Sequence, residues 1–335
     1  MLFTRMAVNA ASSLDPRLRA SVGVLPDTLR PMAQRRVRTR YTLAVTLQAA
    51  LRRVSPSTYK AAVKLRRSEL LHQIAHMPSR RRARQLFRAG CNVAVEIRGA
   101  MGLGGILSNA GEALASGKAH DVTIDLRLTS PTYAPSWDSK GDWLDEYFVR
   151  RQPVHVSRGT CEVRDIPGAG RTLSLRKKAE FVWDYMSIQS KFADEAKAYI
   201  PPQPYAAVHF RGSDKFLEAA PVGMTKVLEV VERQLQTSAI HKLFVASDEP
   251  RFVDLAQQRF GSIVFSVPLQ AVATASGVPA HFTDLPGEIK AKEALVTMLI
   301  LAQAAILVKT ESLLSDWATT LAAQQQVHLV TPSSQ

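Results

Sequence analysis

The C-terminal part of the chain alternates between short apolar runs and longer amphipathic segments, and this alternation constrains the fold most strongly. The apolar runs lie at 206–210, 242–248, 262–268, 305–310 and 327–331. The amphipathic segments between them lie at 225–238, 251–261, 292–304 and 312–324. Short buried strands that are separated by helices form a parallel sheet with helices on both faces. The pattern therefore predicts a doubly wound α/β domain over residues 201–335.

A second α/β unit is predicted over residues 90–200. The strand-like run 92–98 leads into the glycine-rich stretch 99–105, which is followed by a helical segment at 106–117 and another strand at 121–127. This order of strand, glycine loop, helix and strand again favours a parallel sheet. A single long helix is predicted for 175–200, and it ends at the prolines of 201–204, where we place the boundary between the two domains.

Residues 1–89 differ from the rest of the chain in charge. Between positions 30 and 88 there are sixteen lysines and arginines and one acid, Glu69, although the whole chain has a net charge of only +14. Three amphipathic helices are predicted there, at 42–54, 58–77 and 80–90, so this part is expected to be a basic helical extension. His72 and His76 have the i, i+4 spacing of metal ligands, but no third ligand accompanies them, and a plain helix surface is expected.

Several classes of protein are excluded by what the sequence lacks. Its two cysteines, Cys91 and Cys161, form neither a disulfide framework nor a CxxC pair, which favours a reducing compartment. The longest apolar stretch, 294–308, is shorter than the roughly 20 residues of a membrane-spanning helix. The first 15 residues contain no continuous apolar segment of a secretory signal. We therefore expect a cytoplasmic protein.

Three of the predicted strands of the C-terminal domain end in polar residues. These residues are His209, Arg211 and Gly212 at the end of the first strand, Ser247 and Asp248 at the end of the second, and Thr310 and Ser312 at the end of the fourth. In an open parallel sheet, ligands bind outside the carboxyl ends of the strands. Arginine presents a charged fork that matches phosphate oxygens, and glycine allows the backbone to approach a bulky ligand. We expect a phosphate-binding site at this edge.

Two of these residues have an alternative interpretation. Ser312 lies at the start of a predicted helix, where free N–H groups favour an anion, but it is equally consistent with a simple N-cap. Asp248 is a suitable acceptor for the two neighbouring N–H donors of a guanine base, but it could also cap the next helix. The residue pattern alone leaves both alternatives open.

The glycine loop of the first domain is also open to two interpretations. Gly99, Gly102, Gly104 and Gly105 do not form the GxGxxG pattern of a dinucleotide site. They are consistent with a tight turn and close helix packing, and equally with a loop that faces a ligand. The segment 129–148 is rich in aromatic and polar residues, which is typical of an acceptor cleft but also of a surface excursion.

Three stretches in the C-terminal half, HFRGSDK, LFVASDEPRFVDLAQQRFG and LAQAAILVKTESLLSDWA, resemble in order the three motifs of a fucosyltransferase superfamily. This superfamily contains the α1,6-fucosyltransferases, the bacterial nodulation-factor fucosyltransferase and the protein O-fucosyltransferases. The resemblance covers about residues 200–325, and the glycine loop is weakly similar to the one in their acceptor domain. It implies a GT-B fold of two facing Rossmann-like domains, and metal-independent, inverting transfer from GDP-fucose without a further cofactor.

The resemblance assigns roles to individual residues. In the motif HxRxxDK, which is completed by Asp214 and Lys215, Arg211 corresponds to the essential arginine that holds the donor pyrophosphate. His209 and Asp248 correspond to residues that contact guanine, and Thr310 and Ser312 to hydroxyl residues that bind the β-phosphate. The partners that it implies are a nucleotide-sugar donor and a glycan or lipid-linked acceptor.

The sequence departs from the family pattern at four positions. Gly212 stands where the α1,6 enzymes have a second arginine, and Leu313 where they have a second serine. Thr297 stands where many relatives have Asp. Gly105 stands where many relatives have Asn or Asp. These departures put the identity of the sugar in question. They also leave open the alternative that this protein binds a nucleotide sugar without transferring the sugar.

The general base that would activate an acceptor hydroxyl is not identified by the motifs. Glu96, Asp125 and Asp138 are candidates because they lie in the predicted acceptor domain. The charge of the basic segment 30–88 suggests two further possible partners, which are an anionic membrane surface and a nucleic acid. No nucleic-acid-binding motif accompanies its charge.

Overall fold

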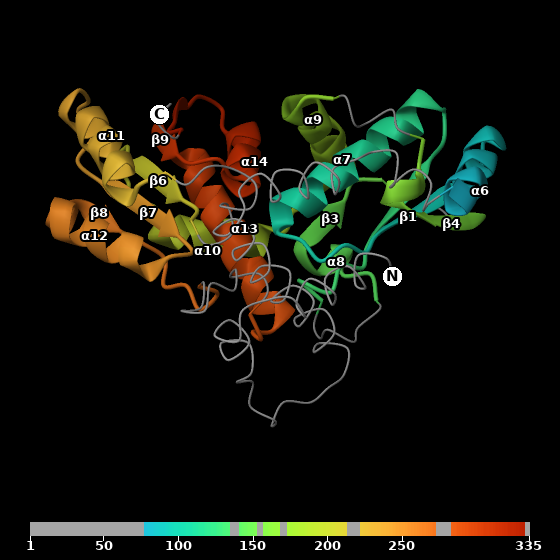
Figure 1. Ribbon diagram of the computed structural model, residues 1–335, viewed down its shortest axis with the longest axis horizontal. Coiled ribbons are helices and arrows are strands. Elements are labelled where there is room, and N and C mark those ends of the chain that lie inside the picture. The colour runs from blue at the N-terminus through green and yellow to red at the C-terminus, as the bar shows by residue number, and fades with distance from the viewer. Residues whose placement is uncertain are drawn as a thin grey trace, which may run out of the picture. The chain divides into compact units, whose positions relative to one another are not determined.

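The computed structural model describes residues 77–134, 141–152, 157–167, 173–212, 222–272 and 283–331 (Figure 1). The predicted α/β class is confirmed, because the described residues form two separate parallel sheets with helices packed on them. The helices predicted at 42–54 and 58–77 and the pair His72 and His76 lie outside the described residues, apart from Met77.

The C-terminal sheet consists of five parallel strands in the order β10-β9-β6-β7-β8. These strands are β6 (Ala206–Phe210), β7 (Leu243–Ser247), β8 (Val264–Phe265), β9 (Ile306–Lys309) and β10 (Gln326–Leu329). They alternate with α11 (Met224–Gln236), α12 (Pro250–Phe260), α13 (Gly287–Gln303) and α14 (Leu313–Leu321). The order reverses at β6, which gives the sheet a topological switch point between β6 and β9, as a doubly wound domain requires.

Both faces of this sheet are covered. Val208, Val245 and Val308 are buried in one cluster with residues of α11 and α12. Ala207 and Phe244 point to the opposite face and belong to a cluster that includes α13. Since successive strand residues face opposite sides, burial on both sides explains why these strands are continuous apolar runs.

The first sheet has three parallel strands in the order β2-β1-β4. Strands β1 (Val93–Ile97) and β2 (Ile124–Leu128) match the prediction, and α7 (Leu103–Ala119) connects them. Strand β4 (Gly159–Glu162) was not predicted. It is four residues long and only half-buried, so its sequence has neither a clear alternation nor an apolar run.

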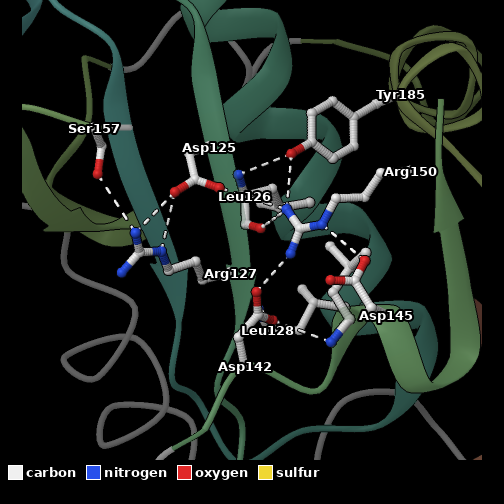
Figure 2. Close-up of polar contacts among 10 residues, drawn as sticks. Asp125, Leu126, Arg127, Leu128, Asp142, Asp145, Arg150, Ser157 and Tyr185 are labelled. Carbon is white, nitrogen blue, oxygen red and sulfur yellow. Dashed lines mark hydrogen bonds and ion pairs between the residues drawn. The ribbon is translucent and has the colours of Figure 1, made fainter. Parts of the chain in front are cut away.

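The outer edge of β2 is covered by side chains instead of another strand (Figure 2). The Leu126 N–H donates to the Tyr185 hydroxyl at 3.1 Å, and Arg150 donates to the Leu126 carbonyl at 2.8 Å. Asp142 accepts from the Leu128 N–H at 2.8 Å. A strand edge leaves N–H and C=O groups unpaired, so these bonds satisfy the outer edge of β2 in the part of the chain that the structure describes.

The single helix predicted for 175–200 is wrong. The structure has α9 (Leu175–Tyr185), then the short strand β5 (Met186–Ile188), then α10 (Ser190–Tyr199). Strand β5 pairs antiparallel with β3 (Phe148–Arg150), which follows α8 (Leu144–Tyr147). This pairing joins residues far apart in sequence and overrides the local helical pattern.

The last of the three basic helices is confirmed as α6 (Met77–Arg88). Ala83 and Phe87 on one face are buried, and Phe87 belongs to the core of the first sheet. Arg81, Arg84 and Arg88 are exposed. The apolar face of α6 is therefore already covered by the protein. Short 3₁₀ helices at Val163–Asp165 and Gly261–Ile263 complete the described elements.

Candidate functional site

The three polar strand ends predicted from the sequence lie next to each other. Strand β6 lies between β7 and β9, so Arg211, Asp248 and Thr310 follow the carboxyl ends of three adjacent parallel strands. Two hydrogen bonds connect the β6 and β9 ends: the Arg211 N–H donates to Thr310 Oγ1 at 3.0 Å, and the Thr310 N–H donates to the His209 carbonyl at 3.1 Å. The hydroxyl of Thr310 thus fixes the backbone of Arg211.

Ser312 precedes the first turn of α14, but its side chain does not cap the helix. Its side chain is buried, with the residue only 1% exposed, and its Oγ has no hydrogen-bond partner among the described residues. A buried hydroxyl without a partner costs free energy, and such an atom calls for an explanation. Ser312 thus holds the N-cap position of α14 without the side-chain hydrogen bond of a simple N-cap, and a hydroxyl beside the free N–H groups of a helix is a suitable contact for an anion.

His209 is the second buried group at this edge with an unpartnered polar atom. The residue is 6% exposed, and its Nδ1 lacks a hydrogen-bond partner within the described ranges. Burial is the main cause that lowers its pKa to about 3, and the charges of Arg211 and Lys309 lower it further. The imidazole is consequently neutral at physiological pH and can either donate or accept a hydrogen bond.

The lowered pKa of His209 predicts a measurable pH effect on stability. Between pH 6.5 and about 3 the unfolded state binds a proton at this position and the folded state does not, so the free energy of unfolding falls as the pH falls. In the wild-type protein the free energy of unfolding should fall by about 2 kcal/mol between pH 7.5 and pH 5 because of this group, and we expect His209→Gln to remove that fall. Urea unfolding of both proteins at several pH values measures this difference. The same dependence of the free energy of unfolding on pH in wild type and variant would contradict the prediction.

Arg211 lies close enough to Tyr133 to affect its pKa. Burial raises the pKa of the Tyr133 hydroxyl to about 12, while the hydrogen bond from the Leu103 N–H and the charge of Arg211 act in the opposite direction. The Leu103 N–H donates to this hydroxyl at 2.8 Å. Tyr133 is therefore protonated, and it connects the first turn of α7 with the neighbourhood of Arg211. The sequence marked it only as one aromatic residue within 129–148.

The glycine loop brings the first turns of α7 and α14 together. Gly102 is the N-cap of α7, and Gly104 and Gly105 lie in its first turn. A Cβ at Gly104 would lie 2.7 Å from the backbone carbon of Leu313, the first residue of α14. Gly104 is thus needed for close helix packing, as one of the two interpretations predicted. The result is that two helix N-termini, both with partial positive charge, lie side by side.

Gly212 follows Arg211 and lies against Glu249. A Cβ at position 212 would overlap the Glu249 carboxylate oxygen Oε1. Burial, and then the charge of Asp248, raise the pKa of Glu249. The sequence did not single out Glu249, which occupies space beside the site that a side chain at position 212 would need.

Asp248 does not hold the N-cap position of α12, because that position belongs to Glu249. The Glu249 N–H donates to the Ser247 hydroxyl at 3.0 Å, and Ser247 is buried. Ser247 therefore shapes the turn that presents Asp248 at the sheet edge. Asp214 and Lys215 lie outside the described residues.

Of the three candidate general bases, the two that the structure describes, Glu96 and Asp125, lie on strands of the first sheet. Asp125 is buried on β2 and accepts from Arg127 at 2.9 Å and 3.1 Å, with Arg150 at 3.5 Å (Figure 2). Glu96 forms an ion pair with Arg98. Asp138 lies outside the described residues. Asp125 thus serves the β2 edge, and its charge is already compensated.

Two cations lie near the edge, together with the carboxylates of Asp248 and Glu249. Besides Arg211, the buried Lys309 lies at the end of β9 beside His209 and forms an ion pair with Asp316 of α14. In the part of the chain that the structure describes, no three His, Cys, Asp or Glu side chains are grouped as metal ligands. An arginine, two helix N-termini and a buried hydroxyl together could hold a phosphate or diphosphate, which is typical of nucleotide-binding α/β proteins.

Comparison with solved structures finds fucosyltransferases. A NodZ α-1,6-fucosyltransferase soaked with GDP-fucose matches 69% of this chain and 92% of its own at 15% identity, with a TM-score of 0.48. The fucosyltransferase NodZ from Bradyrhizobium matches at 14% identity, 69% and 93% coverage and a TM-score of 0.49. POFUT1 in complex with GDP matches at 11% identity, 71% and 98% coverage and a TM-score of 0.44.

No protein-family model and no curated protein sequence matches the chain. At TM-scores below 0.5 the structural likeness by itself carries no statement about activity. An activity has to be inferred from the residues of the site.

Proposed function

We propose that this chain is a glycosyltransferase that binds a GDP-sugar at the carboxyl edge of the C-terminal sheet. Its reaction would be the metal-independent, inverting transfer of the sugar to a hydroxyl of a glycan or lipid-linked acceptor, with GDP-fucose as the first donor to test. The proposal is supported most directly by Ser312, whose buried Oγ has no partner within the described ranges and lies where α14 begins.

The residues at the edge suit the charge that develops in such a reaction. When the bond between sugar and diphosphate breaks, negative charge grows on the leaving group. Arg211 and the start of α14 are proposed to stabilise that charge more in the transition state than in the ground state. Thr310 would keep Arg211 in place through its 3.0 Å hydrogen bond. Asp248 and the neutral His209 are proposed to contact the base, with Asp214 and Lys215 as further donor-binding residues.

The test has two stages. A thermal-shift screen with GDP, UDP, ADP and their sugars should give the largest stabilisation with GDP compounds, about 2.7 kcal/mol at a hundredfold excess over the dissociation constant. Release of GDP from GDP-fucose is then measured with glycan and lipid-linked acceptors. Binding without release would favour a nucleotide-sugar-binding protein that lacks transfer activity. Absence of stabilisation by any nucleotide would contradict the site itself.

Metal independence gives a prediction of its own. The positive charge that a divalent ion supplies in other enzymes is proposed to come from Arg211 and the helix N-terminus. The rate of GDP release from GDP-fucose should therefore stay within about 20% of its value when EDTA is added in excess over any divalent metal, because no metal ion takes part in the step. Loss of activity with EDTA and its recovery with manganese or magnesium would contradict the proposal.

Attachment to the cytoplasmic membrane through the basic segment 30–88 remains a proposal. No helix among the described residues has the length and apolar composition to cross a bilayer. In α6 the apolar face is packed on the protein, so only its exposed arginines remain for an anionic surface or a nucleic acid. A nucleic-acid partner is not expected, and binding to mixed-sequence DNA that weakens steeply with salt would revive it.

Vesicle sedimentation tests the membrane proposal. The full chain should sediment with anionic vesicles at low salt and dissociate as salt rises, since each basic residue contributes about 1 kcal/mol at the surface. The matched variant begins at Met77 and thereby keeps α6, whose Phe87 is part of the core. Equal sedimentation of both proteins, or equal sedimentation with neutral vesicles, would contradict it.

A further inference from the structure

Strand β10 is the last strand of the C-terminal sheet, and its outer edge has no neighbouring strand among the described residues. The Gln326 N–H and the Val330 N–H donate to carbonyls of Ala305 and Lys309. In a parallel strand, alternate residues form their bonds to opposite sides. The N–H and C=O groups of Val327 and Leu329 therefore point to the open edge.

The same two residues are exposed apolar side chains. Val327 is 43% exposed and Leu329 is 55% exposed, which makes them two of the four large hydrophobic residues that are exposed in the described part of the chain. An edge strand with apolar side chains and unpaired backbone groups is a template for another extended segment. Neither a bulge nor a proline blocks this edge within Gln326–Leu329.

A groove of about 660 Å³ lies between this edge and one face of α11. The strand side consists of residues 327–331, and the helix side consists of Lys226, Val230, Arg233, Gln234 and Thr237. The helix residues follow the i, i+4, i+7, i+8 and i+11 spacing of a single face. The groove is thus long and shallow, as an extended peptide needs, and lies beside the open backbone of β10.

The charge of the groove identifies the kind of occupant. Lys226 and Arg233 are two turns apart on the helix side, and Lys226 donates to the Thr331 carbonyl at 2.8 Å, so Arg233 is the cation that faces an occupant. No Asp or Glu is among the described residues that line the groove. A second copy would bring the same positive charges against each other. The basic segment 30–88 of this chain has the wrong sign as well. A partner with carboxylates on one side matches both Arg233 and the strand edge.

We propose that the β10–α11 groove binds an extended, acidic peptide segment of a partner protein, which adds to the sheet as a sixth strand. Main-chain bonds to Val327 and Leu329 supply the register, and carboxylates on alternate residues lie on the side of α11, where one of them faces Arg233. This inference is independent of the proposed transfer activity, since the groove is lined by none of the residues assigned to the donor site.

The experiment uses the full chain and a fluorescein-labelled nine-residue peptide of alternating glutamate and valine. Saturable binding is expected by fluorescence anisotropy, together with hydrogen-exchange protection of the Val327 and Leu329 amides. Arg233→Glu should weaken binding about tenfold at low salt, and Leu329→Lys should weaken it by removing an apolar contact. Arg88→Glu, the same charge change on exposed α6, should leave it unchanged.

Three results would overturn the proposal. They are absence of binding, equal affinity for a peptide with lysine in place of glutamate, and equal loss of binding in the Arg88→Glu control. Protection of Val327 and Leu329 that depends on protein concentration without peptide would identify a second copy as the occupant and also overturn it. Unchanged melting temperatures show that the variants are folded. The peptide result can be interpreted whether or not the protein binds GDP, because the groove and the donor site share no residue.

Discussion

Arg211→Ala is expected to lower GDP release from GDP-fucose by about 100- to 1,000-fold while the melting temperature stays within a few degrees of wild type. Loss of one donor that stabilises developing negative charge commonly has an effect of this size. The fold should persist because Thr310 contacts the backbone N–H of Arg211, which alanine keeps. Steady-state kinetics with a fixed acceptor give the value.

The conservative and control variants make this result specific. Arg211→Lys should also lose most activity, since an ammonium group does not reproduce the bidentate fork of a guanidinium. Arg176→Ala removes an equal charge from an exposed position on α9 and should retain activity. Near-normal turnover of a folded Arg211→Ala protein would remove Arg211 from the site.

Arg150→Met is expected to lower the free energy of unfolding by about 2 kcal/mol, because it removes the hydrogen bonds to the Leu126 carbonyl and the Tyr185 hydroxyl and the ion pair with the partly buried Asp142. The Arg150 side chain is 8% exposed and donates to Asp142 at 2.6 Å and Asp145 at 2.8 Å. It also donates to the Leu126 carbonyl at the β2 edge and to the Tyr185 hydroxyl at 3.1 Å (Figure 2). Urea unfolding curves measure the change.

Arg151→Met is the matched control for this prediction. Arg151 is the next residue in the chain, its side chain is exposed, and its backbone N–H donates to the Tyr185 carbonyl in either variant. The control should change stability by less than about 0.5 kcal/mol. Equal effects of the two substitutions would show that the hydrogen-bonded network around Arg150 does not stabilise the first domain.

The C-terminal sheet could be predicted from the sequence because its pattern is local. Each strand is buried on both faces and so is a short apolar run, and each helix has its own amphipathic period. The predicted segments overlap all five strands and four helices. Helix α13 begins at Gly287, five residues before the predicted start, where no apolar period is visible. The polar strand ends were predictable for the same reason, since they follow directly after these runs.

The first domain was predicted less well because distant contacts decide its structure. Strands β3 and β5 are three residues each and pair residues that are 36 to 40 positions apart, so neither has a signal of its own. The sequence named Asp125 as a candidate base from its location alone, and could not show its ion pairs with Arg127 and Arg150 at the β2 edge. Tyr133 reaches the site only through folding. Glu249 lies directly after Asp248 in the second of the three motif stretches, but the resemblance assigned it no role.

The most direct test of whether the carboxyl edge of the C-terminal sheet binds a nucleoside diphosphate is calorimetric titration with GDP, performed on the full wild-type chain and on Ser312→Ala. Ser312 Oγ is buried and unpartnered in the described structure, so a bound phosphate should supply its missing hydrogen bond, worth about 1 kcal/mol or more. We predict one site in the wild-type protein and about tenfold weaker binding in Ser312→Ala. Absence of GDP binding in wild type, or equal affinity of the two proteins, would contradict the proposed site.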